Sequence, residues 1–196
     1  MGRDNKMLIS KFDNTNIDVA IRELEKMYNL VLPDEYRNFL LKYNGGRTPD
    51  TKFRIDGVSS DIQGFYGLGN ANEYYHFDRL KKVMDWNKWL DSNMFPVATN
   101  ASGDYIMIGT GVGNEGRVYF SYHDRPPRYI ELASDFTTFI RSCKSNKIGY
   151  IRSIEERTND MIKAGKGNKI TPEKIAGWQA EIDEYGSIHQ EQVVID

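Results

Sequence analysis

The most constraining feature of this sequence is a series of short apolar segments joined by connections of only a few residues. Strands are expected at Phe95–Thr99, Asp104–Gly109 and Arg117–Tyr122, with the turn Asn100–Gly103 and a glycine-rich loop between them. Parallel neighbours need a crossover of about a dozen residues or more, whereas antiparallel neighbours are joined by tight turns. Because these connections are too short for crossovers, the pattern predicts an antiparallel sheet.

Three further strand segments and one helix complete the middle of the chain. Phe53–Val58 and Phe65–Leu68 are expected strands separated by the polar turn Ser59–Asp61, and Tyr129–Leu132 is a further short strand. A helix is expected over about residues 73–90, because its apolar residues recur at helical spacing. In the sequence, two of these strands precede the first three and one follows them.

Helices are predicted at both ends of this strand-rich region. The first has an apolar face from Ile17 to Met27, and the second begins at Pro33 and ends at Asn44-Gly45-Gly46, where glycine supplies a left-handed conformation. A closing helix carries Phe136, Phe139, Ile140 and Cys143 on one face, so Cys143 is expected to be an inert buried thiol. The fold class is therefore α+β: a largely antiparallel sheet packed with N-terminal and C-terminal helices.

The chain changes character after residue 146. Residues 1–146 contain 19 basic and 19 acidic residues, whereas residues 147–196 contain 7 basic and 9 acidic residues and are mostly helical in pattern. We expect one domain at 1–146 and a helical C-terminal extension at 147–196 packed on it. Trp178 is the residue expected to dock on the domain, and Val193–Ile195 either adds a short strand or stays frayed.

Composition excludes several functional classes. The formal net charge of −2 argues against a dedicated nucleic-acid binder, which needs surplus cations to displace counterions from phosphate. The apolar runs are too short to cross a bilayer, and the polar first 16 residues show no signal peptide. A single cysteine excludes an internal disulfide framework and fits a reducing compartment. We therefore expect a cytoplasmic protein without a membrane or nucleic-acid partner.

No cofactor, metal or catalytic constellation is predicted. The sequence Gly111-x-Gly113-x-x-Gly116 matches the dinucleotide fingerprint, but the residues after it read as a strand rather than the helix that would receive a pyrophosphate. A hairpin loop is the favoured interpretation. His76, His123 and His189 share no metal-ligand spacing, and no nucleophile motif is present.

A family resemblance emerges from the helix and turn motifs. Leu32-Pro33-Asp34-Glu35-Tyr36, followed by Phe39-Leu40 and Asn44-Gly45-Gly46, resembles the signature of the SUKH (Smi/Knr-type) superfamily. The Pro96–Ala98 strand, the Ser102–Asp104 turn, Gly116–Phe120 leading to His123, and the closing helix Asp135–Ile140 fit the same pattern. The resemblance covers roughly residues 15–145.

The resemblance implies a non-catalytic protein-binding domain. Bacterial members of the superfamily are chiefly immunity proteins that bind and neutralise a cognate protein toxin, often a nuclease. Eukaryotic members include a regulator of cell-wall synthesis, so a regulatory or scaffold module of the same fold is the alternative. A hydrolytic enzyme is the least favoured class. The matched residues build caps, turns and core, and they do not locate an interface.

Acidic and aromatic residues in the middle of the chain are the predicted toxin-binding surface. An acidic face accelerates association with a basic toxin, and tyrosine and tryptophan are effective interface anchors. The same residues also fit an ordinary solvated surface with some core positions. The predicted set consists of Asp56, Asp61, Tyr66, Glu73, Tyr74, Tyr75 and Trp86.

Overall fold

The computed structural model describes residues 6–83, 90, 92–124 and 129–195, and it divides the chain into two compact units. The larger one, called the sheet unit below, comprises residues up to Asn146 together with Gln190–Asp196. The smaller one, called the helical insert, comprises Lys147–His189. The last segment of the chain thus belongs to the sheet unit, whereas the sequence-based division assigned all of 147–196 to the extension. Packing of the extension on the domain stays a prediction.

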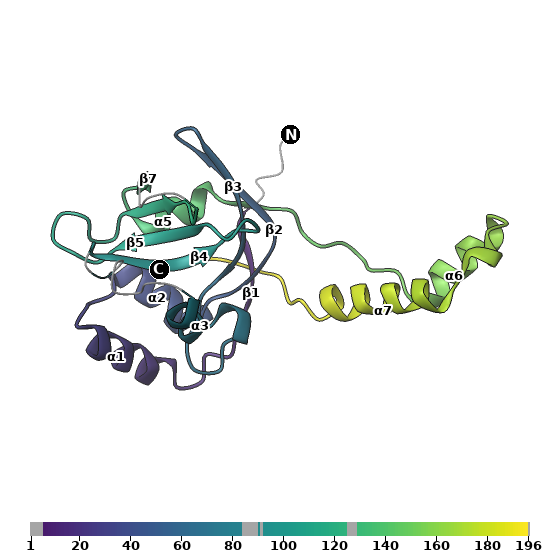
Figure 1. The fold of residues 1–196 in the computed structure, drawn as a ribbon, viewed down its shortest axis with the longest axis horizontal. Helices are drawn as coiled ribbons and strands as arrows, with labels where there is room; N and C mark the ends of the chain where they lie inside the picture. Colours follow the sequence, from purple (N-terminus) through teal and green to yellow (C-terminus); the bar gives the residue numbers. More distant parts are fainter. Residues whose placement is uncertain (1–5, 84–89, 91, 125–128, 196) are drawn as a thin grey trace. The chain divides into compact units, whose positions relative to one another are not determined.

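The sheet unit is built on an antiparallel sheet, as predicted (Figure 1). Among the described residues the main path runs β7-β6-β5-β4-β3-β2-β1-β9, and β8 pairs with β2 beside β1. The strands are β1 (Leu8–Lys11), β2 (Gly46–Ile55), β3 (Val58–Phe65), β4 (Met94–Thr99), β5 (Tyr105–Gly109), β6 (Val118–Ser121), β7 (Ile130–Ala133), β8 (Lys144–Ser145) and β9 (Glu191–Gln192). With the helices this confirms the α+β fold class.

Helices cover the sheet through a cluster of aromatic rings. The described helices of this unit are α1 (Ile17–Tyr28), α2 (Asp34–Tyr43), α3 (Phe77–Val83) and α5 (Phe136–Ser142). The ring of Phe39 on α2 lies 5.1 Å from that of Phe65 on β3 and 5.3 Å from that of Phe136 on α5. Because all three side chains are buried, these contacts join both helices to the sheet in one core. Cys143 is buried as predicted.

The hairpin between β2 and β3 turns earlier than predicted. Asp56 and Gly57 form the turn, with φ angles of 44° and 83°, and Ile55 pairs with Val58. Asp-Gly is a preferred pair for a two-residue turn that needs positive φ at both positions. The predicted turn at Ser59–Asp61 is therefore wrong, since these residues lie inside β3.

The predicted helix over 73–90 also begins later in the structure. Glu73–Tyr75 forms a short 3-10 helix, η1, and α3 starts only at Phe77. The side chain of Asn72 accepts a hydrogen bond from the backbone N–H of Tyr74, which caps η1 and separates it from α3. The remainder of the predicted helix, including Trp86, lies largely outside the described residues.

The turn after α2 ties several distant segments together. Asn44 is buried, and its amide nitrogen donates to the carbonyl oxygens of Asp13 at 2.6 Å and Leu68 at 2.8 Å. Its side-chain oxygen accepts from the N–H of Leu68 at 2.9 Å. A Cβ on Gly45 would lie 2.6 Å from the carbonyl oxygens of Phe65 and Tyr66. The Asn-Gly-Gly motif therefore fixes the backbone that follows β3.

The helical insert contains two antiparallel helices and no buried residue. Its elements are α6 (Ile154–Lys163), the short 3-10 helix η2 (Gly167–Lys169) and α7 (Pro172–Gly186). Arg157 on α6 forms two hydrogen bonds with Glu181 on α7, and its guanidinium group lies 6.0 Å from the ring of Trp178. No residue from 147 to 189 is buried. Docking of Trp178 on the main domain stays a prediction.

The chain re-enters the sheet unit after the insert. β9 pairs with β1, the N–H of Val193 donates to the carbonyl of Met7 at 3.0 Å, and the N–H of Val194 donates to the Tyr43 hydroxyl at 3.0 Å. Val193 is buried. The added strand lies at Glu191–Gln192, just before Val193–Ile195, where a short strand or a frayed end was predicted; Val193–Ile195 itself forms no strand, but the backbone N–H groups of Val193 and Val194 are hydrogen-bonded to the sheet unit. No helix among the described residues is long and apolar enough to cross a membrane.

Candidate binding site

A cavity of about 330 Å³ opens on the sheet unit between the end of β3, η1, α3 and the β4–β5 turn. We call it the tyrosine hollow, because four tyrosines lie in its wall. A space of this size accommodates a large side chain or a small ligand. Its lining residues are Gln63, Tyr66, Tyr74, Tyr75, Arg79, Leu80, Thr99, Asn100, Ala101 and Tyr105.

Tyr66 is the buried tyrosine of the hollow. It follows β3 directly, in the segment fixed by Asn44 and Gly45, and its N–H donates to the carbonyl of Val97 at 2.9 Å. Burial raises the pKa of Tyr66, although a hydrogen bond with the Thr99 side chain acts in the opposite direction. The hydroxyl therefore stays protonated at neutral pH and remains a neutral hydrogen-bonding group.

Tyr74, Tyr75 and Arg79 form the more exposed wall. Tyr74 is 61% exposed, and the guanidinium carbon of Arg79 lies 5.0 Å from the centre of its ring. Tyr75 is half-buried and stacks on Phe12 with ring centres 6.1 Å apart. A cation over the face of a ring is attracted by its quadrupole, which holds the Tyr74 ring and the Arg79 side chain beside each other. This wall offers aromatic area and a positive charge.

The opposite wall comes from the β4–β5 turn. Asn100 and Asp104 close the turn through two hydrogen bonds, of 2.8 Å and 3.0 Å, between the amide of Asn100 and the backbone N–H and carboxylate of Asp104. The carboxylate of Asp61 accepts from the N–H of Ala101 at 3.0 Å, which joins β3 to the turn. Burial and the charge of Asp104 raise the pKa of Tyr105, the adjoining tyrosine.

The structure brings together only part of the predicted surface. Tyr66, Tyr74 and Tyr75 line the hollow. Asp61 adjoins it through Ala101, and the exposed Glu73 precedes Tyr74 on η1. Asp56, at the tip of the β2–β3 hairpin, is not among the residues that line it, and Trp86 lies outside the described residues. Whether these residues bind a partner stays a prediction.

Sequence reasoning missed the other half of the hollow. Arg79, Asn100 and Tyr105 were not in the predicted set, which treated the region as acidic and aromatic. The pairing of Gly64 with Thr99 brings the β4–β5 turn beside the end of β3. The sequence contains no local signal for this pairing, since 35 positions separate the two residues, so only a pairing order for the strands would have revealed it.

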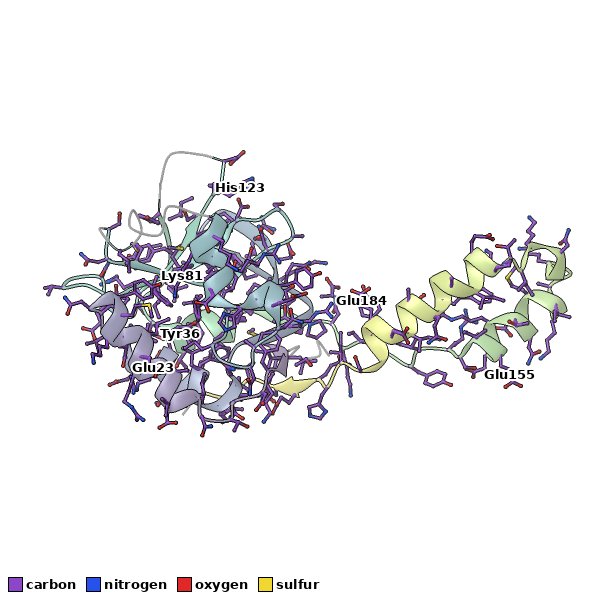
Figure 2. All side chains as sticks on the ribbon, turned by 60° about the horizontal axis from the view of Figure 1, so that its bottom comes forward. Glu23, Tyr36, Lys81, His123, Glu155 and Glu184 are labelled. Carbon is purple, nitrogen blue, oxygen red and sulfur yellow. The ribbon has the colours of Figure 1, made fainter. Side chains whose placement is uncertain are left out.

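Asp104 also belongs to the one cluster among the described residues with metal-ligand spacing. Ligand atoms of Asp104, His123 and Asp124 lie within 4.8 Å of one another (Figure 2 labels His123). Asp104 already accepts hydrogen bonds on both oxygens, from His123 at 2.9 Å and from Asn100 at 3.0 Å. Burial opposes its ionisation, but these hydrogen bonds outweigh burial and lower its pKa. The close approach of Asp104 and His123 is therefore explained by the hydrogen bonds that hold the β4–β5 turn.

The glycine-rich loop connects two paired strands. Gly111, Gly113 and Gly116 lie between β5 and β6, which pair antiparallel. The hairpin-loop interpretation is confirmed, because the residues after Gly116 form a strand and provide no helix N-terminus for a phosphate.

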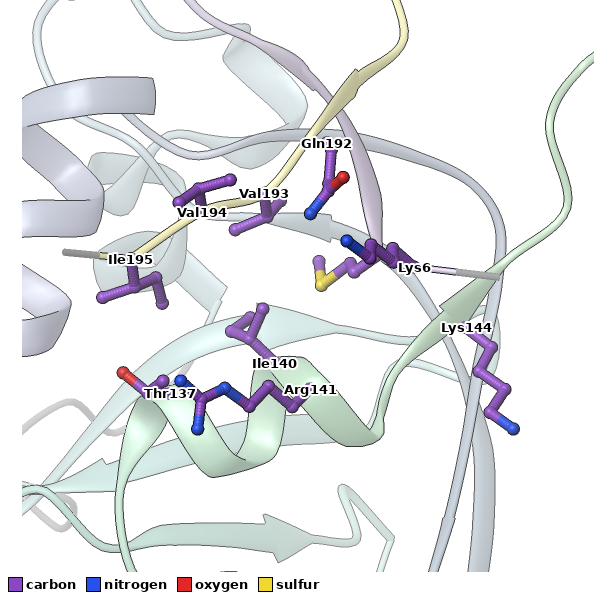
Figure 3. A pocket seen from close by; sticks show the side chains of 10 residues that line it. Lys6, Thr137, Ile140, Arg141, Lys144, Gln192, Val193, Val194 and Ile195 are labelled. Atoms are coloured by element: carbon purple, nitrogen blue, oxygen red, sulfur yellow. The ribbon is translucent and has the colours of Figure 1, made fainter. Parts of the chain in front are cut away.

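A second cavity, of about 400 Å³, lies between α5 and the C-terminal segment (Figure 3). Ile140 on α5 points toward the segment that carries Val193, and both side chains are buried. The rim carries the cationic residues Lys6, Arg141 and Lys144. Five of its ten lining residues are apolar, namely Met7, Ile140, Val193, Val194 and Ile195, so the cavity combines an apolar part with positive charge.

The fold and its aromatic hollow define an α+β domain with a concave, tyrosine-rich surface. Residues 18–142 match the SMI1 / KNR4 family (SUKH-1), and the chain belongs to this family. It is similar to the SPbeta prophage-derived uncharacterized protein YokK of Bacillus subtilis (strain 168), at 25% identity over 156 residues, covering 67% of this chain and 77% of the relative. No solved structure matches the chain. The family assignment confirms the resemblance inferred from the sequence motifs.

Proposed function

We propose that this chain is a cytoplasmic immunity protein that binds a cognate protein toxin and blocks it without catalysing a reaction. The family is generally one of immunity proteins of toxin systems. The observation that carries the proposal is the tyrosine hollow, which combines four tyrosines with Arg79 in one concave surface. Tyrosine and arginine are enriched among the residues that dominate protein–protein binding energy.

The partly exposed state of the hollow suits a protein partner. Tyr74 and Arg79 are exposed, whereas Tyr66 is buried, so an inserted side chain would meet an anchored floor and an accessible rim. The floor is held by the Asn44 network and by the β4–β5 turn. A preorganised pocket loses little conformational entropy on binding, which favours slow dissociation.

Acidic residues near the hollow are proposed to accelerate association with a basic toxin. Asp56 and Glu73 are exposed, and Asp61 is partly exposed beside Ala101. Nuclease toxins need positive charge to hold phosphate, so negative charge on the inhibitor increases the encounter rate. Arg79 provides a local cation within this surface, which would select a partner that places a carboxylate or carbonyl group at that point.

We propose that the protein catalyses no reaction, because its single cysteine is buried and because Asp104 holds the β4–β5 turn. Burial raises the pKa of Cys143, and its sulfur donates to the carbonyl of Phe139 at 3.3 Å. A thiol nucleophile needs the opposite, a lowered pKa and an accessible sulfur. Asp104 and His123 are committed to the β4–β5 turn. Blocking by occupancy is therefore the proposed mechanism.

Co-expression with a candidate toxin domain, sought among the genes that neighbour this one, tests the proposal. Cells that produce both proteins are expected to survive, and the purified proteins are expected to form a stable complex. A regulatory or scaffold module would be folded and soluble in the same cells yet would leave them unprotected. Death of cells that contain folded protein would overturn the immunity assignment.

Charge removal tests the acidic contribution separately. In the triple variant Asp56→Asn, Asp61→Asn, Glu73→Gln, each replacement keeps the side-chain shape, and asparagine tolerates the positive φ of the hairpin turn. We expect about a tenfold lower association rate at low salt, with a smaller difference as salt rises. The matched control is Glu23→Gln, Glu115→Gln, Glu155→Gln, which removes three exposed charges elsewhere. Equal rates for both variants would contradict the proposed steering.

A further inference from the structure

We propose that the helical insert is a self-association surface that pairs with the insert of a second copy of this chain. The proposal is independent of toxin binding, because it rests on residues 147–189 alone. Three observations support it: apolar side chains without a core, an unneutralised cluster of lysines at one end, and an acidic cluster at the other end.

The insert leaves its apolar side chains accessible. Ile162 on α6 is 57% exposed, and Ile175 and Tyr185 on α7 are 38% and 39% exposed. Trp178 and Ile182, on the same side of α7 as Ile175, are only partly buried. Isolated helices of this length are marginal in water without tertiary packing. Association of two such helix pairs into a four-helix bundle would bury these side chains.

One end of the insert is positively charged. Lys163 ends α6, and Lys166 and Lys169 flank and end η2. None of these three lysines forms an ion pair within the described part of the chain. Three cations in seven residues repel one another, and an acidic partner would relieve that repulsion.

The other end of α7 is acidic, against the helix dipole. Asp183 and Glu184 lie in its last turns, and no basic residue lies in the last turn (Figure 2 labels Glu184). The C-terminus of a helix carries partial negative charge, and these two acids add to the negative charge at this end of the insert. A local rule broken in this way is typical of a site that meets a partner.

These charges favour a second copy over a charged partner. The insert contains seven basic and seven acidic residues, so it has no net charge to attract a basic toxin. In a dimer with a two-fold axis perpendicular to α7, the two inserts lie antiparallel. The lysine end of each copy then lies beside the acidic end of the other. The same arrangement covers the exposed isoleucines of both copies. The surface is therefore complementary to itself.

Sedimentation equilibrium of the full chain over a wide concentration range tests the proposal. We expect a reversible monomer–dimer equilibrium in the wild type and a monomer in Ile162→Asp, Ile175→Asp. The control is Val112→Asp, which places the same charge at a fully exposed valine of the sheet unit and should leave the dimer intact. A wild type that is monomeric at every concentration would overturn the proposal, whether the insert docks on its own sheet unit or on a toxin.

Charge exchange tests the antiparallel arrangement itself. One variant carries Lys163→Glu, Lys166→Glu, Lys169→Glu, and the other carries Asp183→Lys, Glu184→Lys. Each should self-associate at least about tenfold more weakly, because each brings like charges together. An equimolar mixture should form a heterodimer of nearly wild-type affinity, since both pairs of ends are then complementary. Dimers that persist in each variant alone, or a mixture that stays monomeric, would contradict this pairing. Circular dichroism checks that the helices remain.

Discussion

Each described α-helix of the sheet unit buries apolar side chains, whereas no residue from 147 to 189 of the helical insert is buried. The sheet unit packs Phe39, Phe65 and Phe136 into one aromatic cluster. The insert is held by surface contacts such as the pair of hydrogen bonds between Arg157 and Glu181. Burial is the main favourable term in folding, and exposed ion pairs contribute little.

Because of this difference, we expect the stability of the two units to respond differently to substitutions. In the sheet unit, stability and the shape of the tyrosine hollow come from the same residues, since Asn44 and Gly45 fix the backbone that carries Tyr66. In the insert no side chain is buried, so we expect substitutions there to leave the sheet unit folded. The sheet unit is therefore expected to carry recognition by fixed geometry, and the insert is expected to contribute through association.

The largest predicted effect comes from the chain's return to the sheet. Ser145 accepts a hydrogen bond from the N–H of Leu8 at 2.8 Å, and Leu8 pairs with Gln192. The residues of the sheet unit that flank the insert, Ser145 and Gln192, therefore both contact Leu8. A short Gly/Ser linker in place of 147–189 should leave the stability nearly unchanged. Truncation after Asn146, which also removes β9 and the buried Val193, should cost about 4 kcal/mol in urea unfolding. Equal stability of the two variants would show that β9 contributes nothing.

Loss of a buried asparagine side chain should lower the free energy of unfolding more than loss of an exposed one. Asn44→Ala removes three hydrogen bonds inside the sheet unit and should lower the free energy of unfolding by about 3 kcal/mol. Asn159→Ala, at an exposed position of α6, should change it by less than about 0.5 kcal/mol. Chemical denaturation measures both. Similar losses for the two variants would remove the distinction between the units.

Thiol labelling measures the same contrast between a buried and an exposed position. Cys143 is 1% exposed and its pKa is raised by burial, so it should react slowly until the protein unfolds. A cysteine introduced by Asn168→Cys in a Cys143→Ala background should react as fast as an unfolded peptide. Cys143→Ala itself should cost about 1 kcal/mol. Rapid labelling of native Cys143 would place it outside the core.

The smallest effect is expected at Tyr36. This side chain is buried, and its hydroxyl has no hydrogen-bond partner among the described residues. Removing an unsatisfied hydroxyl costs nothing in lost bonds, so Tyr36→Phe should leave stability unchanged or raise it by up to about 1 kcal/mol. A clear loss of stability in thermal unfolding would reveal a polar interaction of this hydroxyl.

Local signals predicted much of the fold. Pro33, the Asn-Gly-Gly turn and the apolar face with Cys143 located the helices, because caps and periodicity are encoded within a few residues. The short connections predicted antiparallel strands. The Asp56-Gly57 turn was overlooked in favour of a polar triplet, although Asp-Gly is the stronger hairpin signal.

Prediction of the hollow was limited by long-range pairing. Tyr74 and Tyr75 attract notice as neighbouring aromatics, but Tyr105 reaches the same cavity only through the pairing of β3 with β4 and of β4 with β5. The return of β9 to β1 spans most of the chain and likewise leaves no local trace. Sequence patterns therefore predicted three lining residues, Tyr66, Tyr74 and Tyr75, but not the wall formed by the β4–β5 turn.

The affinity for a purified cognate toxin, compared between two tyrosine variants, tests the central claim most directly. Tyr74→Ala removes an exposed ring of the tyrosine hollow, and Tyr150→Ala removes an exposed ring of the helical insert as a control. If the hollow is the toxin-binding site, Tyr74→Ala should weaken binding by about 2 kcal/mol, roughly thirtyfold in Kd and mostly through faster dissociation. Tyr150→Ala should leave Kd unchanged. Equal affinities for wild type and Tyr74→Ala would contradict the assignment of the hollow as the binding site.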